Sequence, residues 1–134
     1  MAKAYIAVSN TKRQSLSNVL KCITTTLKEC SIESFIFVDQ YQFTATAEKQ
    51  MMQQAMAAID DCDILIAETS DKAIGIGAEV GYAKAKGKPV IYMRHADAAH
   101  STTISGISDF QIIYYSNDDL KLALKNVITL LIKL

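Results

Sequence analysis

Several features are scarce or missing in this sequence, and each gap excludes a class of protein. The 134 residues include no tryptophan and one proline, and no repeat or linker interrupts them. Fourteen basic and fourteen acidic side chains give a formal net charge of zero, whereas a nucleic-acid surface normally needs a basic excess. No apolar run approaches the ~18 residues of a membrane span. We therefore expect a single domain, residues 1–134, that binds neither nucleic acid nor membrane.

Cysteine and histidine are also too few and too scattered for a metal or redox site. Cys22, Cys30 and Cys62 are odd in number and form no C-x-x-C pair, and His95 and His100 lie five residues apart. The first residues enter a strand pattern directly, without the layout of a signal peptide. The expectation is a cytoplasmic protein with reduced core thiols, no metal and no cofactor.

What the sequence does contain is a strict alternation of short apolar strands and amphipathic helices. Helix 13–29, for example, repeats apolar residues at helical spacing from Leu16 to Leu27. Such alternation favours a parallel sheet covered on both faces. We predict a flavodoxin-like, Rossmann-like three-layer sandwich with five parallel strands in the order 2-1-3-4-5. The expected strands are 3–8, 34–39, 63–67, 90–93 and 111–115, the helices are 13–29, 47–60, 76–86 and 117–134, and 94–106 is an irregular segment.

The stretch 63–83 organises this pattern, because a buried strand runs into a polar turn and then a helix. In the predicted strand order, the carboxyl ends of strands one and three meet at the switch point. That convergence brings Ser9, Asn10 and Thr11 beside residues 70–77 and predicts a ligand pocket there.

Glycines and one acid supply the chemistry of this pocket. Gly75 and Gly77 either let the backbone approach an anionic ligand or form a tight turn that lets the helix pack closely. The spacing does not match a dinucleotide fingerprint, and no phosphate-gripping lysine follows. Glu79 is open to three interpretations: a nucleophile or base, an acid matched to the helix dipole, or half of a buried ion pair.

At these residues the chain resembles the nucleoside 2-deoxyribosyltransferase family, which includes the 2'-deoxynucleoside 5'-phosphate N-hydrolases. The resemblance is carried by 62–68, by the G-x-G-x-E-x-G-x-A run 75–83 and by 87–90, and it continues through 101–109 and weakly through 5–9. It implies the same flavodoxin-like fold. It also implies that Glu79 attacks the anomeric carbon and forms a covalent glycosyl intermediate, as in a retaining glycosidase.

The resemblance further implies a substrate site. Gly75 and Gly77 match family glycines beside sugar and phosphate, Tyr5 matches a tyrosine near the sugar, and Ser9, with Asn10 beside it, matches a polar residue of the first loop. Ser101 matches a residue that a neighbouring subunit lends to the active site. The expected state is therefore a homodimer or higher homo-oligomer with shared active sites.

Some family features are missing. The family carries an acid before strand three, but the matching positions 53–55 are Gln, Gln and Ala, and a further substrate-contacting position is Ala73. Glu48, Glu68 and Asp71 are candidates to replace that acid. The first loop lacks the Arg- and Gly-rich run of the N-hydrolases, which leaves Lys12 and Arg13 as candidate phosphate ligands.

The leading hypothesis is an enzyme that cleaves or transfers the N-glycosidic bond of a nucleoside or its 5'-monophosphate through Glu79. The alternative is a non-catalytic nucleotide-binding or sensor module that kept the pocket and lost the assisting acid. A flavin carrier is disfavoured by the missing tryptophan and by a first loop without a phosphate-binding run. The base, the sugar, the need for a 5'-phosphate, and hydrolysis versus transfer stay open.

Overall fold

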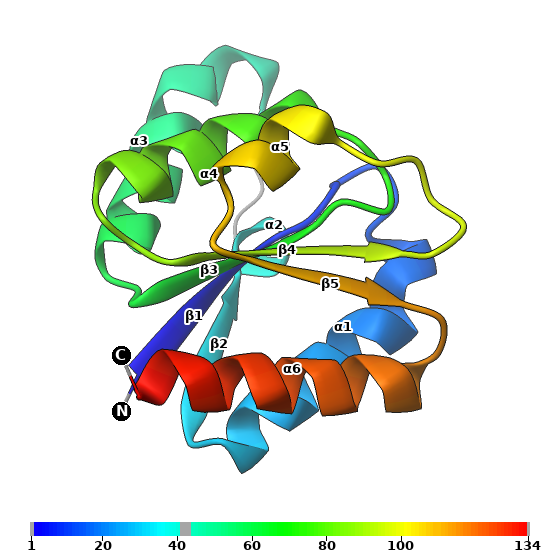
Figure 1. Cartoon of the computed structure of the whole chain (residues 1–134). Coiled ribbons are helices and arrows are strands. Elements are labelled where there is room, and N and C mark those ends of the chain that lie inside the picture. The colour runs from blue at the N-terminus through cyan, green and yellow to red at the C-terminus, as the bar shows by residue number, and fades with distance from the viewer. Residues whose placement is uncertain (1, 41–43, 134) are drawn as a thin grey trace.

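A five-stranded parallel sheet forms the centre of the molecule (Figure 1). We describe it from a computed structural model, which covers residues 2–40 and 44–133. The strands lie in the order β2-β1-β3-β4-β5, as predicted from the sequence. In chain order they are β1 (Ala2–Ala7), β2 (Ile32–Ile36), β3 (Ile64–Glu68), β4 (Val90–His95) and β5 (Phe110–Tyr114).

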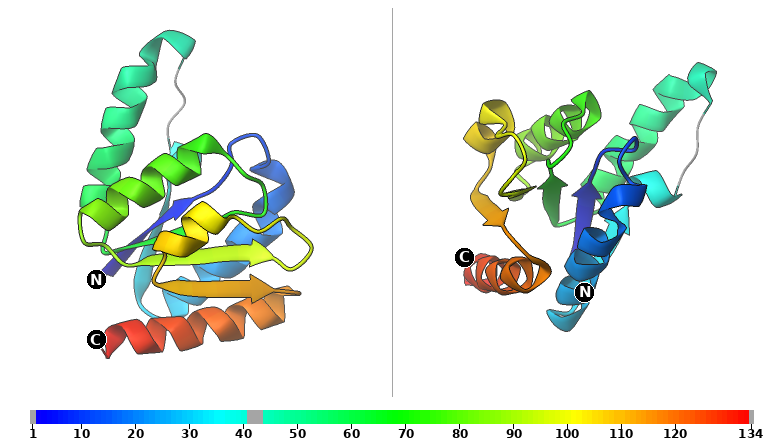
Figure 2. Two further views of the ribbon diagram at one scale, coloured as in Figure 1. Left: turned by 45° about the horizontal axis from the view of Figure 1, so that its top comes forward. Right: turned by 90° about the vertical axis from the view of Figure 1, so that its right-hand side faces the viewer.

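Helices cover both faces of the sheet and make a three-layer sandwich (Figure 2). One face packs against α1 (Ser17–Glu29) and α6 (Asn117–Ile132), and the other packs against α3 (Glu48–Asp60), α4 (Ile74–Ala85) and α5 (Thr102–Ile107). Each strand contributes to both cores because its side chains alternate between the faces. In β3, Ile66 belongs to the core under α1 and α6, whereas Leu65 and Ala67 belong to the core under α3 and α4.

The long helices form where the apolar periodicity predicted them. In α1 the predicted stripe is buried at Leu20, Ile23 and Leu27 and partly buried nearer the helix start. Burying three such side chains stabilises the fold by about 1.5–3 kcal/mol each relative to exposure. Gly87 ends the α4 segment with a φ of 75°, the left-handed conformation that glycine adopts without strain.

The second strand was predicted too late in the chain. Ser31, two residues after the end of α1, takes a φ of 60°. The next residue, Ile32, already pairs with Ala2, so β2 begins two residues earlier than expected. The chain then turns into a short helix, α2 (Phe37–Gln40), with the Phe37 side chain buried. The apolar run from Phe35 to Val38 therefore serves a strand and a helical turn in succession. Part of the predicted loop that follows, residues 41–43, lies outside the described residues.

Two other boundaries also differ from prediction. The segment 94–106 is not irregular throughout, because β4 extends to His95 and α5 begins at Thr102. The Ser101 hydroxyl caps α5 by accepting the Ile104 N–H, a polar start that is typical of helices. α4 begins at Ile74, which places both predicted loop glycines inside the helix.

Candidate active site

A cavity of about 580 Å³ opens where the carboxyl ends of β1 and β3 diverge. This is the predicted position, because the first loop and the start of α4 both line it. The helices α2 and α3 line the remaining sides. The lining residues are Val8, Ser9, Asn10 and Thr11 of the first loop, Phe37 and Val38 of α2, Met51, Met52 and Ala55 of α3, and Ala73, Gly75, Ile76 and Glu79 around α4.

Glu79 provides the carboxylate of the cavity. It lies in the second turn of α4, half-buried, between the buried residues Ile76 and Val80 that anchor the helix to the sheet. Burial raises the pKa of Glu79 from its ordinary 4.5 to about 7, and a hydrogen bond from Tyr5 lowers it in part. A carboxylate held in this way is a poorly solvated base or nucleophile near neutral pH.

The Tyr5 hydroxyl donates a hydrogen bond to Oε2 of Glu79. Tyr5 is fully buried in β1, and its ring lies 5.9 Å from the ring of Phe35 and 6.4 Å from that of Phe37. Burial and the neighbouring Glu79 charge raise the pKa of Tyr5, so the phenol keeps its proton and acts as a donor. No other hydrogen bond to Glu79 is found among residues 2–40 and 44–133, which leaves Oε1 for a ligand.

The other predicted site residues divide into two groups. Ser9, Asn10 and Gly75 line the cavity with Glu79. Gly77 lies one turn along α4 and does not line it, and Ser101 also lies outside it. The backbone N–H of Ser101 donates to the Tyr92 hydroxyl at 3.0 Å. Within one subunit, Ser101 is therefore a helix cap.

The methionines of α3 contact both the core and the cavity. Met51 and Met52 are half-buried and line the cavity, and Met51 also packs against the core under α3 and α4. Periodicity identifies the inward face of a helix without showing which part of that face meets a cavity. The fully buried part of α3 is instead Ala55 and Ile59. Ala55 contacts the cavity at one of the positions where the family resemblance places an acid.

Glu68 does not replace that acid. It is fully buried, and its partner Tyr114 belongs to the core against α1 and α6, on the face of the sheet opposite α4. The Ser70 N–H donates to Oε1 at 2.5 Å and the Tyr114 hydroxyl donates to Oε2 at 2.5 Å. Burial raises the pKa of Glu68, and these two donors oppose the rise. Of the other candidates, Glu48 is exposed and Asp71 half-buried, and neither lines the cavity.

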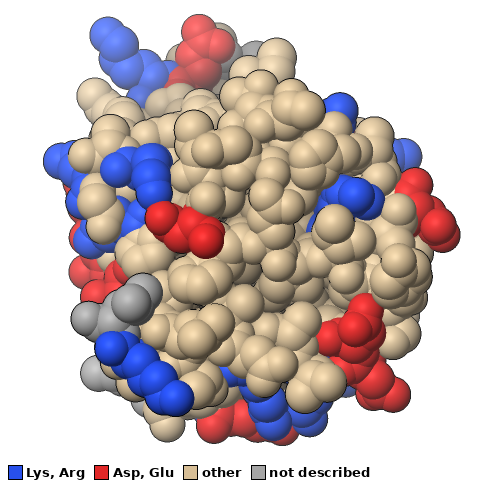
Figure 3. Space-filling view, in the orientation of Figure 1, with Lys and Arg blue, Asp and Glu red and all other residues tan. Residues whose placement is uncertain are grey.

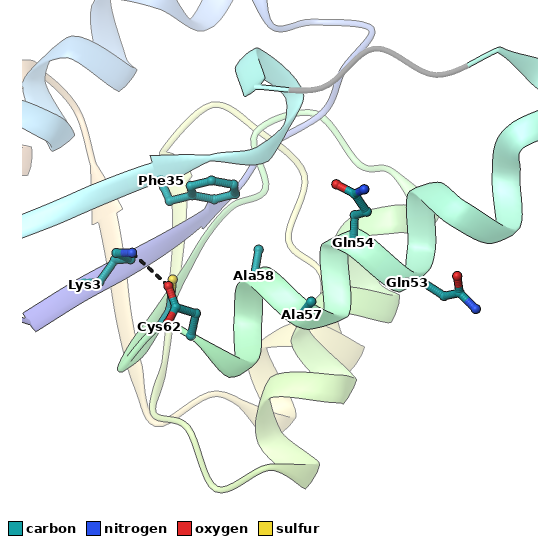
Figure 4. A pocket seen from close by; sticks show the side chains of 8 residues that line it. Lys3, Phe35, Gln53, Gln54, Ala57, Ala58 and Cys62 are labelled. Carbon is teal, nitrogen blue, oxygen red and sulfur yellow. Dashed lines mark hydrogen bonds and ion pairs between the residues drawn. The ribbon is translucent and has the colours of Figure 1, made fainter.

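A second cavity, of about 500 Å³, lies between α3 and the strands β1 and β2 (Figure 4). Its charged groups are Lys3 and Asp61, whose side chains pair at 2.9 Å. Cys62 also lines it, but burial raises the pKa of this thiol to about 11, so it is protonated at neutral pH. The cavity beside Glu79 is therefore the better candidate for chemistry.

Nothing in the described part of the chain forms a metal centre. No group of three or more His, Cys, Asp or Glu side chains is arranged to hold an ion in residues 2–40 and 44–133. Cys22 and Cys30 are half-buried, Cys62 is buried, and all three are free. Among these same residues, no helix has both the length and the apolar character needed to cross a membrane.

A parallel α/β sheet with an acid-bearing cavity at its switch point defines a class of proteins that bind small ligands. The family itself follows from the sequence match. The model of the nucleoside 2-deoxyribosyltransferase family matches residues 4–124, and the chain belongs to this family. The resemblance noted from the motifs is thereby confirmed.

One curated relative agrees with this assignment. A putative 2'-deoxynucleoside 5'-phosphate N-hydrolase 1 of Thermofilum pendens is 29% identical over 75 residues, which span 53% of this chain and 52% of that protein. The match thus covers about half of the length of this curated relative.

Solved structures share the fold. The CMP N-glycosidase BcmB of Clostridium botulinum superposes with a TM-score of 0.69 at 20% identity, covering 92% of this chain and 98% of that one. A 2-deoxyribosyltransferase of Bacillus psychrosaccharolyticus gives a TM-score of 0.70 at 18% identity, covering 90% of each chain.

Proposed function

We propose that this protein cleaves or transfers the N-glycosidic bond of a nucleoside or nucleotide through a covalent glycosyl-Glu79 intermediate. The observation that carries the proposal is the Glu79 carboxylate, which lines the cavity and is held through one oxygen by Tyr5. The family membership and the names of the relatives support a reaction at this bond.

The proposed chemistry follows from the two oxygens of the carboxylate. Oε2 is fixed by the Tyr5 hydroxyl, so Oε1 attacks the anomeric carbon of a sugar bound in the cavity. A bond from Oε1 to this carbon forms as the bond from the carbon to the base nitrogen breaks, and the base leaves with the electron pair and takes up a proton from solvent. Water or a second base then attacks the same carbon and releases the carboxylate.

The surroundings of Glu79 suit an attack near neutral pH. With a pKa of about 7, the carboxyl is largely ionised above neutrality yet poorly solvated, which favours nucleophilic attack. We assign Ser9, Asn10 and Gly75 to sugar binding because they line the same cavity. Gly77, which does not line it, would act only through the helix backbone.

We also propose that two subunits share active sites, with Ser101 donated by the partner. Ser101 stands at the start of α5 and does not line the cavity of its own subunit, so it is available to another. Ile74 at the start of α4 is 96% exposed. In the orientation of Figure 1, charged side chains lie mainly toward the outline of the molecule and leave a broad uncharged area over its middle (Figure 3). An uncharged area of this kind suits a homodimer interface.

The free cysteines support a location in the cytoplasm. Three thiols that form no disulfide fit a reducing compartment.

The alternative function, a non-catalytic nucleotide sensor, is favoured by one observation. Ala55 and Ala73 line the cavity where the family resemblance expects substrate-contacting polar residues. Without an acid to protonate the departing base, binding without turnover is the competing outcome.

Release of free base from a panel of nucleosides and their 5'-monophosphates, followed by chromatography, separates the two functions. We expect release by the wild type and its loss in Glu79→Gln. An added second base that yields a new nucleoside identifies a transferase. Binding without release from any substrate would refute the enzyme and support the sensor.

A further inference from the structure

The first loop and α2, which both contribute residues to the lining of the cavity, are joined by an ion pair. Arg13 Nε lies 2.6 Å from Asp39 Oδ1, and Arg13 Nη2 lies 2.7 Å from Asp39 Oδ2. Arg13 Nη1 donates to the Ser17 hydroxyl at 3.1 Å. All three nitrogens of the guanidinium are therefore engaged within the protein, in the two-pronged geometry that makes such pairs strong.

Both residues of the pair follow closely in sequence after residues that line the cavity. Arg13 follows the lining residue Thr11 by two positions, and Asp39 follows the lining residue Val38 by one. The Asp39 carboxylate thus binds the arginine that the first loop would otherwise offer to a ligand.

In the part of the chain that the structure describes, no cation takes the place of Arg13 in the cavity lining. Among residues 2–40 and 44–133, the side chains that line the cavity include one charged group, the Glu79 carboxylate. Lys12 is exposed and does not line the cavity. Residues 41–43, which follow α2 in the sequence, are Tyr, Gln and Phe and add no basic group.

This charge distribution disfavours a phosphorylated ligand. A phosphate monoester carries about −1.5 to −2 charges at pH 7. It would share the cavity with Glu79, and none of the described residues of the same subunit that line this cavity is basic. The amino end of α4 also meets the cavity at Gly75. Its N–H groups bind a neutral hydroxyl or a phosphate oxygen, and the helix dipole favours the anion. The carboxylate of Glu79, in the second turn of the same helix, sets a full negative charge against that partial positive one.

We infer that the substrate is an uncharged nucleoside rather than a 5'-monophosphate, and that Asp39 sets this preference by withholding Arg13. This inference rests on the proposed function. It differs from what the names of the Thermofilum pendens relative and the Clostridium botulinum glycosidase say of those proteins, which are named for nucleotides.

Two measurements test the preference separately from catalysis. Calorimetric binding to Glu79→Gln compares each 2'-deoxynucleoside with its 5'-monophosphate, and turnover by the wild type compares kcat/KM for the same pairs. We expect the nucleoside to be preferred in both. A wild type without turnover whose Glu79→Gln variant binds nucleosides preferentially would refute the proposed function and keep this inference. Tighter binding of the monophosphate, or binding of neither ligand, would overturn it.

The role of Asp39 is tested by releasing the arginine. Asp39→Asn keeps the side-chain shape and removes the charge that holds Arg13, so the monophosphate-to-nucleoside ratio of kcat/KM should rise about tenfold, the effect of one hydrogen bond to a charged group. The same ratio of binding constants is measured in Glu79→Gln/Asp39→Asn. The double variant Arg13→Gln/Asp39→Asn has no arginine to release, so its monophosphate-to-nucleoside ratio should return to the wild-type value.

Two further variants serve as controls. Glu33→Gln removes the same charge near the far end of β2, and Lys12→Ala removes the exposed lysine of the first loop. Neither should change the ratio. A ratio that stays constant in Asp39→Asn while circular dichroism shows a folded protein, or a ratio that falls in Lys12→Ala, would overturn the assignment.

Discussion

The raised pKa of Glu79 predicts that replacing this residue makes the protein more stable. The folded protein holds the Glu79 proton more tightly than the unfolded chain does, because the pKa is about 7 in the fold and 4.5 ordinarily. Below pH 4.5 the carboxyl is protonated in both the folded and the unfolded chain, so it does not lower the stability of the fold. As pH rises from 4.5 to 7 the unfolded chain ionises first, so stability falls, and above 7 the cost is constant.

The size of this cost follows from the same two pKa values. Each pKa unit corresponds to about 1.4 kcal/mol, so the full cost is about 3 kcal/mol at pH 8 and less than about 1 kcal/mol at pH 5. Glu79→Gln carries no charge at either pH and keeps an oxygen that accepts the Tyr5 hydroxyl. We therefore expect the free energy of unfolding of the variant to exceed that of the wild type by up to about 3 kcal/mol at pH 8 and by much less at pH 5.

Urea unfolding of both proteins at the two pH values measures the difference directly, with Glu33→Gln as the control for losing one negative charge. A gain of equal size at both pH values, or a variant less stable than the wild type at pH 8, would refute the reasoning. Either result would mean that the Glu79 carboxylate is not poorly solvated in the cavity.

Three further predictions follow from the site and its support. Tyr114→Phe leaves the buried Glu68 with one donor and should cost about 1–3 kcal/mol, more at pH 8 than at pH 5; equal urea midpoints at both pH values would contradict this. Gly75→Ala and Gly77→Ala should each raise the free energy of unfolding by about 0.5–1 kcal/mol, because alanine favours a helix over glycine and an added Cβ meets no atom within 4 Å. In base-release assays only Gly75→Ala should lose activity, and a loss in both would contradict the cavity geometry. Ala55→Asp should cost about 3 kcal/mol or more by thermal unfolding and speed base release; unchanged release would show that the acid is not limiting.

The sequence was sufficient for the sheet order and for the position of the cavity. Both follow from the alternation of strands and helices, since right-handed crossovers leave few possible orders and the switch point is a property of the order. Glu79 was singled out by its place after a buried strand among apolar neighbours. The role of Tyr5 beside Glu79 could not be predicted from the local sequence pattern. Only the family resemblance placed this tyrosine in the site.

Other features depend on tertiary approach and have no local signal. Arg13 and Asp39 lie 26 positions apart and meet because β2 ends early and α2 turns back toward the first loop. Met51 and Met52 follow a core-like period but lie where α3 passes the cavity. Similarly, the Ser101 cap starts a helix inside a segment whose polar composition is typical of loops.

The central claim is that Glu79 forms a covalent bond to the sugar. The most direct test is rapid acid quenching of wild-type protein during turnover of a 2'-deoxynucleoside, followed by proteolysis and mass spectrometry of the peptide that contains Glu79. We predict a glycosyl adduct on Glu79 that is absent from Glu79→Gln. Base release without any adduct on this residue, or an adduct on another side chain, would contradict the account.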